Sequence, residues 1–163
     1  MEFLAQAAAH WLDLLTAFCM SMLPVLELRG GIVFAAARGI PFVLAFLVCL
    51  LGNILPIPFI LLFLRRVFAF LERFRYTARL VRWLERKARK KEGKLQKYEL
   101  LGLFLLVAIP LPGTGAWTGA LVAVVFDIQI RKSFPVIALG VLAAGCVMAA
   151  LSYLAPDLFF SFA

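Results

Sequence analysis

The sequence has few of the residues that enzymes use for chemistry. It contains a single histidine, His10, three cysteines and nine acidic residues among 163. The cysteines lie singly in apolar segments, as packing residues do, and no His, Cys or carboxylate cluster has the spacing of a metal site. No Ser or Thr has a base beside it to activate a nucleophile. We therefore expect no enzyme activity, no metal and no other cofactor.

Charge is missing over long stretches of the chain. The sequence is 64% hydrophobic and only 16% charged, whereas soluble domains are about half apolar and a quarter charged. Three runs, 42–64, 100–126 and 133–156, carry no charge over 23, 27 and 24 residues. Each exceeds the ~18 residues that indicate a membrane span. The sequence predicts an all-α integral membrane protein, multi-pass and located in the inner (plasma) membrane.

The basic residues are concentrated in one segment. Arg65 to Lys97 holds 13 of the 17 Lys and Arg residues, against only three glutamates. Its apolar residues recur at spacings of three and four, which predicts an amphipathic helix on the cytoplasmic membrane surface, bound to anionic lipid headgroups. Nucleic acid is the competing partner for such a patch. We do not expect it, because membrane spans on both sides place lipid headgroups nearest.

Two parts of the chain share a layout. Residues 23–53 and 109–145 each begin near a proline, continue through a small-residue run and a short polar turn, and end in a long apolar segment. With one gap, two glycine pairs align, Gly30 with Gly119 and Gly52 with Gly140. We therefore expect an internal repeat of residues 1–64 and 99–163, joined by a basic linker at 65–98.

The first limb of each unit is too short to span a membrane. Residues 11–23 number 13, or ~20 Å of helix, against a hydrocarbon core of ~30 Å. This favours re-entrant hairpins at about 11–38 and 100–128, followed by true spans at about 41–64 and 133–155. The charge rule places the basic linker and Arg131 in the cytoplasm, and the chain order then puts the turn at Arg38 outside. The hairpins would then enter from opposite faces, as in the inverted repeats of many transporters. The alternative is four ordinary, kinked spans.

The second hairpin carries the strongest helix-breaking stretch of the chain, PLPGTGAWTGALVA. A break at membrane depth must be buried in protein or line a wet cavity. The prolines remove amide donors and the glycines permit a tight reversal, so we expect the tip at Pro110, Pro112, Gly113 and Gly115. Three nearby side chains are candidate substrate contacts: Thr114, Trp117 and Thr118.

The first hairpin contains two charges, Glu27 and Arg29, in an otherwise apolar run, with Gly30 and Gly31 expected at its tip. A charge inside a span is costly and usually faces an interior pathway. In the functional interpretation Arg29 receives an anionic group and Glu27 carries a proton. The alternative is a mutually neutralising pair that only closes the tip. Asn53, beside two prolines in the first span, is a further substrate-binding candidate at an expected kink.

Three motifs, ELRGG, GNILPIP and PLPGTGAWTGALVA, stand in this order around the basic linker. In this they resemble the small multidrug export protein family, over roughly residues 11 to 155. One position departs from the family, because Val33 stands where a proline is frequent. That family is grouped as a distant relative of the bacterial DedA membrane proteins. The resemblance implies paired re-entrant hairpins and the flipping of lipids, including polyprenyl phosphates.

From these features we expect a transporter or flippase for an amphipathic anionic substrate such as a lipid phosphate, proton-coupled through Glu27. The alternative is a small multidrug or cation exporter with Glu27 as the cation site. A membrane enzyme or a purely structural protein explains the sequence less well. No nucleotide-binding motif is present, so any pumping would use an ion gradient. A homodimer is compatible with the sequence, which does not determine the oligomeric state.

Overall fold

The computed structural model describes residues 10–71, 96–111 and 113–154. The regular structure in this part of the chain is helical, as the sequence predicts. The expected amphipathic surface helix falls largely on residues 72–95, outside the described residues. The described helices are α2 (Trp11–Met22), α3 (Glu27–Ala37), α4 (Phe42–Ile54), α5 (Ile57–Leu71), α7 (Gln96–Ala108), α8 (Ala116–Val125) and α9 (Ile130–Leu154).

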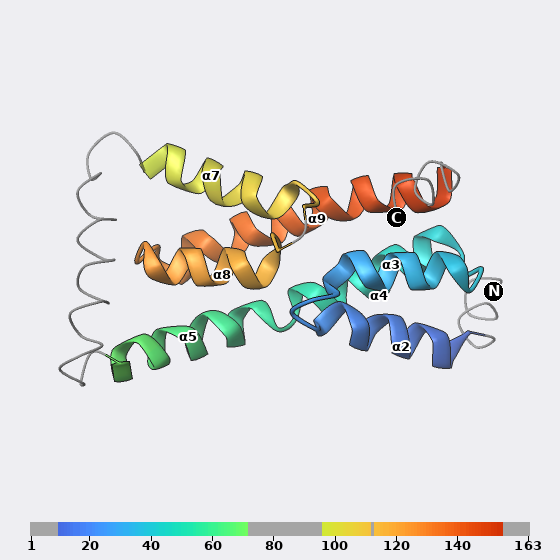
Figure 1. Ribbon diagram of the computed structural model, residues 1–163, viewed down its shortest axis with the longest axis horizontal. Helices are drawn as coiled ribbons and strands as arrows, with labels where there is room; N and C mark the ends of the chain where they lie inside the picture. The colour runs from blue at the N-terminus through green and yellow to red at the C-terminus, as the bar shows by residue number, and fades with distance from the viewer. Residues whose placement is uncertain (1–9, 72–95, 112, 155–163) are drawn as a thin grey trace.

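Two long apolar elements run the length of the molecule (Figure 1). One is α4 with α5, which form a single stretch, Phe42–Leu71, with a short break at Leu55 and Pro56 and an 18-residue part of mean hydropathy 2.5. The other is α9, whose span Ile130–Tyr153 contains an 18-residue part of mean hydropathy 2.3. At 1.5 Å per residue they measure roughly 45 and 36 Å, enough to cross a bilayer. Large apolar side chains on their outer faces, such as Phe59 and Phe63, are exposed, as lipid-facing residues are.

The short helices form two hairpins. In the first hairpin α2 packs against α3, and in the second hairpin α7 packs against α8. Each hairpin begins and ends at one end of the molecule, and the two tips meet midway along it (Figure 1). With 10 to 13 residues per limb, each limb reaches only ~15–20 Å, about half of a hydrocarbon core. The chain therefore reverses between the two limbs of each hairpin, and the limbs do not join into one kinked span.

Both second limbs end in the same way. After α3, Gly39 N–H donates to Ala36 O and Ile40 N–H to Ala35 O; after α8, Asp127 and Ile128 make the corresponding bonds. Gly39 and Asp127 both have left-handed φ values, 70° and 52°. These are Schellman turns, which satisfy the last carbonyls of a helix and reverse the chain. They lie 88 positions apart (39 and 127), and α4 and α9 begin with the same separation (42 and 130).

Side chains fix these turns to the long helices. The Tyr153 hydroxyl of α9 donates to Ile40 O over 2.9 Å. The Arg65 guanidinium of α5 donates to Ile128 O. Donors and acceptors again differ by 88 positions (65 and 153, 40 and 128). The two ends of the molecule are thus closed by equivalent bonds from different side chains.

Glycines allow the hairpins to pack closely on the long helices. A Cβ at Gly52 of α4 would lie 2.6 Å from Phe18 O, and one at Gly140 of α9 would lie 3.2 Å from Phe104 O. This supports the alignment of Gly52 with Gly140. The alignment of Gly30 with Gly119 is wrong by one residue, because Gly31 packs on α2 as Gly119 packs on α7. An internal repeat accounts for these matched contacts, and it stays a prediction.

Candidate functional site

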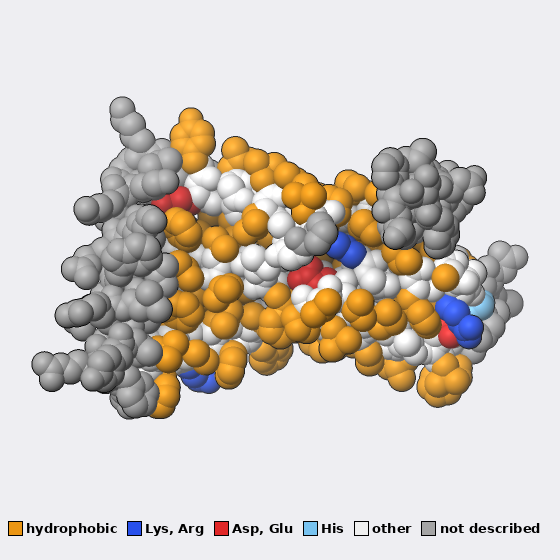
Figure 2. All heavy atoms as spheres, in the orientation of Figure 1, with side chains coloured by type: hydrophobic (Ala, Val, Ile, Leu, Met, Phe, Trp, Pro, Cys, Tyr) orange, Lys and Arg blue, Asp and Glu red, His pale blue; other side chains and the backbone are white. Residues whose placement is uncertain are grey.

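The hairpin tips bring the two mid-chain charges to the centre of the molecule. The other described charged residues stand near the outer ends of their helices or in the turns there. Figure 2 shows red and blue side chains adjoining midway along a largely apolar surface. Glu27 begins α3 and Arg29 follows in its first turn. The first hairpin therefore presents both charges to the tip of the second.

Glu27 caps the N-terminus of α8. Its side chain is almost completely buried, with 5% exposed, and its Oε1 accepts the amide N–H of Trp117 over 3.2 Å. A Cβ at Gly115 would lie 1.9 Å from Oε2 of Glu27, so the carboxylate fits only against a glycine. A helix N-terminus carries unpaired N–H groups and about half a positive charge, and a carboxylate complements both. Glu27 also has a left-handed φ of 51°, an uncommon conformation that recurs at functional sites.

Arg29 caps the end of α7. Its guanidinium donates to Leu111 O, to Ile109 O over 3.2 Å and to Thr114 Oγ1 over 3.2 Å. α7 ends at Ala108 and Pro110 supplies no amide hydrogen, so these oxygens lie outside the helical hydrogen bonds. Within the turn, Ile109 O also accepts the Leu111 N–H over 2.9 Å and Leu111 O the Thr114 N–H over 3.2 Å, and each carbonyl has a second lone pair for Arg29. A cation at a helix C-terminus is stabilised by the negative end of the helix dipole.

Glu27 and Arg29 form no ion pair with each other among the described residues. The mutually neutralising pair considered from the sequence is thus not a direct salt bridge, and its role as a closure of the tip stays an untested interpretation. Each charge instead interacts with a helix end of the other hairpin. Glu27 and Arg29 therefore bind different parts of the second tip, Glu27 the N-terminus of α8 and Arg29 the end of α7.

The polar residues of the second tip bond to its own backbone. The Thr114 hydroxyl lies 2.9 Å from Ile109 O and 2.8 Å from Leu111 O, and the Thr118 hydroxyl donates to Gly113 O over 2.9 Å. The reversal uses Gly113 and Gly115, whose φ values of 79° and 144° suit glycine. Pro112 lies outside the described residues.

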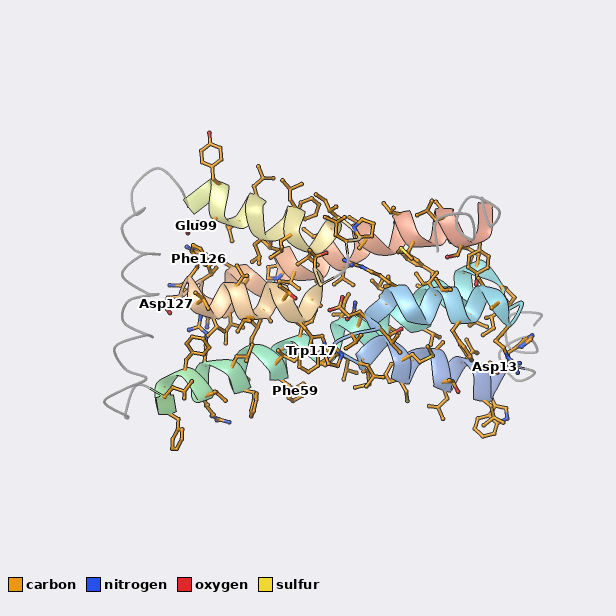
Figure 3. The ribbon with its side chains drawn as sticks, viewed as in Figure 1. Asp13, Phe59, Glu99, Trp117, Phe126 and Asp127 are labelled. Carbon is orange, nitrogen blue, oxygen red and sulfur yellow. The ribbon has the colours of Figure 1, made fainter. Side chains whose placement is uncertain are left out.

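Trp117 contacts the first hairpin in the way that Arg29 contacts the second. Its indole N–H donates to Met22 O at the end of α2, over 3.3 Å. Arg29 and Trp117 stand 88 positions apart (29 and 117), and each donates to the end of the first helix of the opposite hairpin. Figure 3 places Trp117 midway along the molecule, whereas Asp13 lies at one end and Glu99 and Asp127 at the other.

Three of the site residues predicted from the sequence lie away from the place where Glu27 and Arg29 contact the second tip. Gly30 and Gly31 lie inside α3, beyond the first tip at residues 23–26, and serve close packing. Asn53 is buried in α4 just before the break, and its Oδ1 has no hydrogen-bond partner in the described part of the chain. It therefore does not bond the freed backbone as the sequence suggested.

Sequence reasoning missed the backbone oxygens of Met22, Ile109 and Leu111 as partners of Arg29 and Trp117. Every residue has a backbone carbonyl, so the sequence does not indicate which carbonyls accept these bonds. The indirect signal is a proline, since Pro24 and Pro110 follow these helix ends and remove the amides that would otherwise extend the helices.

The sequence pattern of the family described as "Putative small multi-drug export protein" matches residues 27–147. The chain belongs to this family. The match begins at Glu27, directly after the first tip, and covers α3, α4, α5, the second hairpin and most of α9. The family description names export, and the apolar helices agree with a membrane protein. No curated protein and no solved structure matches the chain significantly. The relation to DedA proteins stays an expectation.

Proposed function

We propose that this protein is a multi-pass exporter of the inner (plasma) membrane, which moves small amphipathic cations outward in exchange for protons at Glu27. The family description supports the export of small molecules. Within the chain, the observation that carries the proposal is the position of Glu27, almost completely buried midway between two hairpin tips. This favours the exporter over the lipid-phosphate flippase that we expected first.

The charge balance around Glu27 supports a cation or proton as its ligand. Arg29 turns its guanidinium toward the α7 end, so it does not neutralise the carboxylate directly. The group bonded to the carboxylate is the N-terminus of α8, which supplies only about half a unit of positive charge. A proton or a cationic headgroup would complete the neutralisation. For exchange, Glu27 must at least bind a proton and the cationic headgroup in turn.

The engagement of Arg29 also weighs against an anionic substrate. A lipid phosphate would have to displace Ile109, Leu111 and Thr114 before it could use the guanidinium. A cation needs no such displacement at Glu27. The absence of a nucleotide-binding motif in the sequence leaves an ion gradient as the driving force.

The test is transport by purified protein in proteoliposomes, with ethidium as the cation probe and a trapped pH dye to follow protons. We expect ethidium to move against a proton flux in the wild type. Glu27→Gln should lose both fluxes and Glu27→Asp should keep part of them. Asp13→Asn is the matched control, since Asp13 is an acid near the start of α2. Proton-coupled ethidium transport by Glu27→Gln would overturn the proposal.

A lipid-phosphate flippase is the second candidate, and the half-buried Arg29 favours it. A guanidinium can donate two parallel bonds to a phosphate. A fluorescent polyprenyl phosphate in the same vesicles tests this function. Movement of that lipid that depends on Arg29, without ethidium export, would replace the exporter by the flippase.

A further inference from the structure

Three oxygen atoms crowd together at the end of α7. They are Ile109 O, Leu111 O and Thr114 Oγ1, which we call the oxygen cluster. The hydroxyl oxygen lies 2.9 Å from one carbonyl oxygen and 2.8 Å from the other. A hydroxyl has one proton, so it can donate to only one of the two carbonyls. The other close oxygen pair has no hydroxyl hydrogen between its members and repels, although the backbone N–H groups of Leu111 and Thr114 already donate to Ile109 O and Leu111 O.

A positive charge relieves this repulsion, and Arg29 supplies it. Its Nη2 lies 3.2 Å from both Ile109 O and Thr114 Oγ1, while its Nη1 bonds Leu111 O. The negative end of the α7 dipole adds to the attraction. The turn of the second hairpin thus builds a cation-binding cluster, and a side chain of the first hairpin occupies it.

The oxygen cluster is accessible from the outer surface of the helices. Ile109 and Leu111 are about half exposed, at 46% and 54%, and Arg29 is partly exposed. The blue patch midway along the surface in Figure 2 agrees with this access. Because the surrounding surface is apolar, a molecule with its tail in lipid could bring a cationic headgroup directly to the cluster.

We propose that the oxygen cluster is an exchangeable binding site for planar guanidinium and amidinium groups, and that exported compounds with such headgroups replace Arg29 there. The inference rests on the proposed export function and names its substrate class. Planarity matters because two nitrogens held in one plane reach three oxygens at once, a geometry that an ammonium lacks. Thr114 then selects the ligand, since its hydroxyl joins both carbonyls.

The first experiment uses Arg29→Ala, which empties the oxygen cluster. The thermal unfolding midpoint in detergent is measured with guanidinium chloride, ammonium chloride or urea at constant ionic strength and low concentration. We expect guanidinium to raise the midpoint by about 2–4 °C once it exceeds its dissociation constant several-fold. Ammonium should have less effect. Urea, which has the shape without the charge, should have none.

Two controls separate site binding from general salt effects. Wild-type protein should show a smaller rise than Arg29→Ala, because guanidinium must displace its own Arg29 from the cluster. Arg38→Ala, which removes an arginine bonded to Asp13 on an exposed surface, should respond as wild-type protein does. An Arg29→Ala response to guanidinium no larger than that to urea, or an equal response in Arg38→Ala, would overturn the inference.

A second measurement uses Arg29-containing protein and so does not depend on the folding of Arg29→Ala. Proteoliposomes are supplied with octylguanidinium, octylammonium or octylurea. We expect wild-type protein to prefer octylguanidinium over octylammonium, and Thr114→Val to lose that preference. If wild-type protein transports octylguanidinium and octylammonium equally, the guanidinium site is wrong and the export proposal still holds. If transport does not depend on Glu27, the export proposal is wrong and the guanidinium site is not affected.

Discussion

Glu27 and Gly115 fit together because glycine has no side chain. The Oε2 atom of Glu27 occupies the space where a Cβ at residue 115 would lie, 1.9 Å away. The two residues stand 88 positions apart (27 and 115), and both have positive φ values, 51° and 144°. The first part of the chain therefore has a carboxylate at the position where the second part has a glycine that leaves room for it.

The first prediction follows from this fit. Gly115→Ala should expel the Glu27 carboxylate from the α8 N-terminus and lower the free energy of unfolding by ~2–4 kcal/mol, through backbone strain and overpacking. Gly113→Ala is the matched control, because Gly113 has a φ of 79° with nothing within 4 Å of its Cβ position. It should cost only the strain, about 1–2 kcal/mol. Thermal unfolding in detergent checks both, and equal losses would mean that the carboxylate does not need this space.

The second prediction concerns the two charges together. Glu27 and Arg29 cap different helix ends, so the effects of Glu27→Gln and Arg29→Gln on unfolding free energy should add to within ~0.5 kcal/mol. Each charged hydrogen-bonding group is worth roughly 1.5–3 kcal/mol. Denaturant unfolding of the two single variants and the double variant measures the coupling. A double variant as stable as wild type would show that the charges neutralise each other after all.

The third prediction tests the close packing of the hairpins. Gly52→Ala and Gly140→Ala should each lower the unfolding free energy by about 1–3 kcal/mol, since the new methyl groups meet α2 and α7. Gly102→Ala is the control, because a Cβ there meets nothing within 4 Å. It should stabilise α7 by about 0.5–1 kcal/mol, as alanine does in a helix interior. Thermal melts of the three variants decide, and a neutral Gly52→Ala would contradict the packing.

The fourth prediction concerns orientation in the membrane. In a variant without native cysteines, a cysteine at residue 131 should react with an impermeant maleimide only from the cytoplasmic side. A cysteine at residue 38 should react only from outside. Residue 38 follows α3 and residue 131 lies in the first turn of α9, and the two stand at opposite ends of the molecule. Labelling of both residues from the same side of intact cells would exclude hairpins that enter from opposite faces.

Much of the fold could be predicted from lengths and breaks. Limbs of 10 to 13 residues are too short to span a bilayer, and Pro24, Pro110 and the glycines after it mark where each chain reverses. The importance of Glu27 and Arg29 followed from the cost of charge in an apolar run. These inferences need only composition and spacing.

The partners of those charges could not be predicted. Apart from the Thr114 hydroxyl, Arg29 binds carbonyl oxygens, and Glu27 binds the amide N–H of Trp117, so most of these partners are backbone groups that a sequence does not display. The one-residue error at Gly30 has a related cause. Adjacent glycines look alike in sequence, and only the packing against Ser21 identifies Gly31 as the contact residue.

The reciprocal capping of the two tips has a consequence for biogenesis. The first hairpin is synthesised before residues 109–117 exist, so Glu27 and Arg29 enter the translocation machinery without the helix ends that later satisfy them. Uncapped charges at that depth oppose stable insertion. The first hairpin is therefore fully stabilised at that depth only after the second hairpin has joined it, which ties the stable integration of the first half to the synthesis of the second.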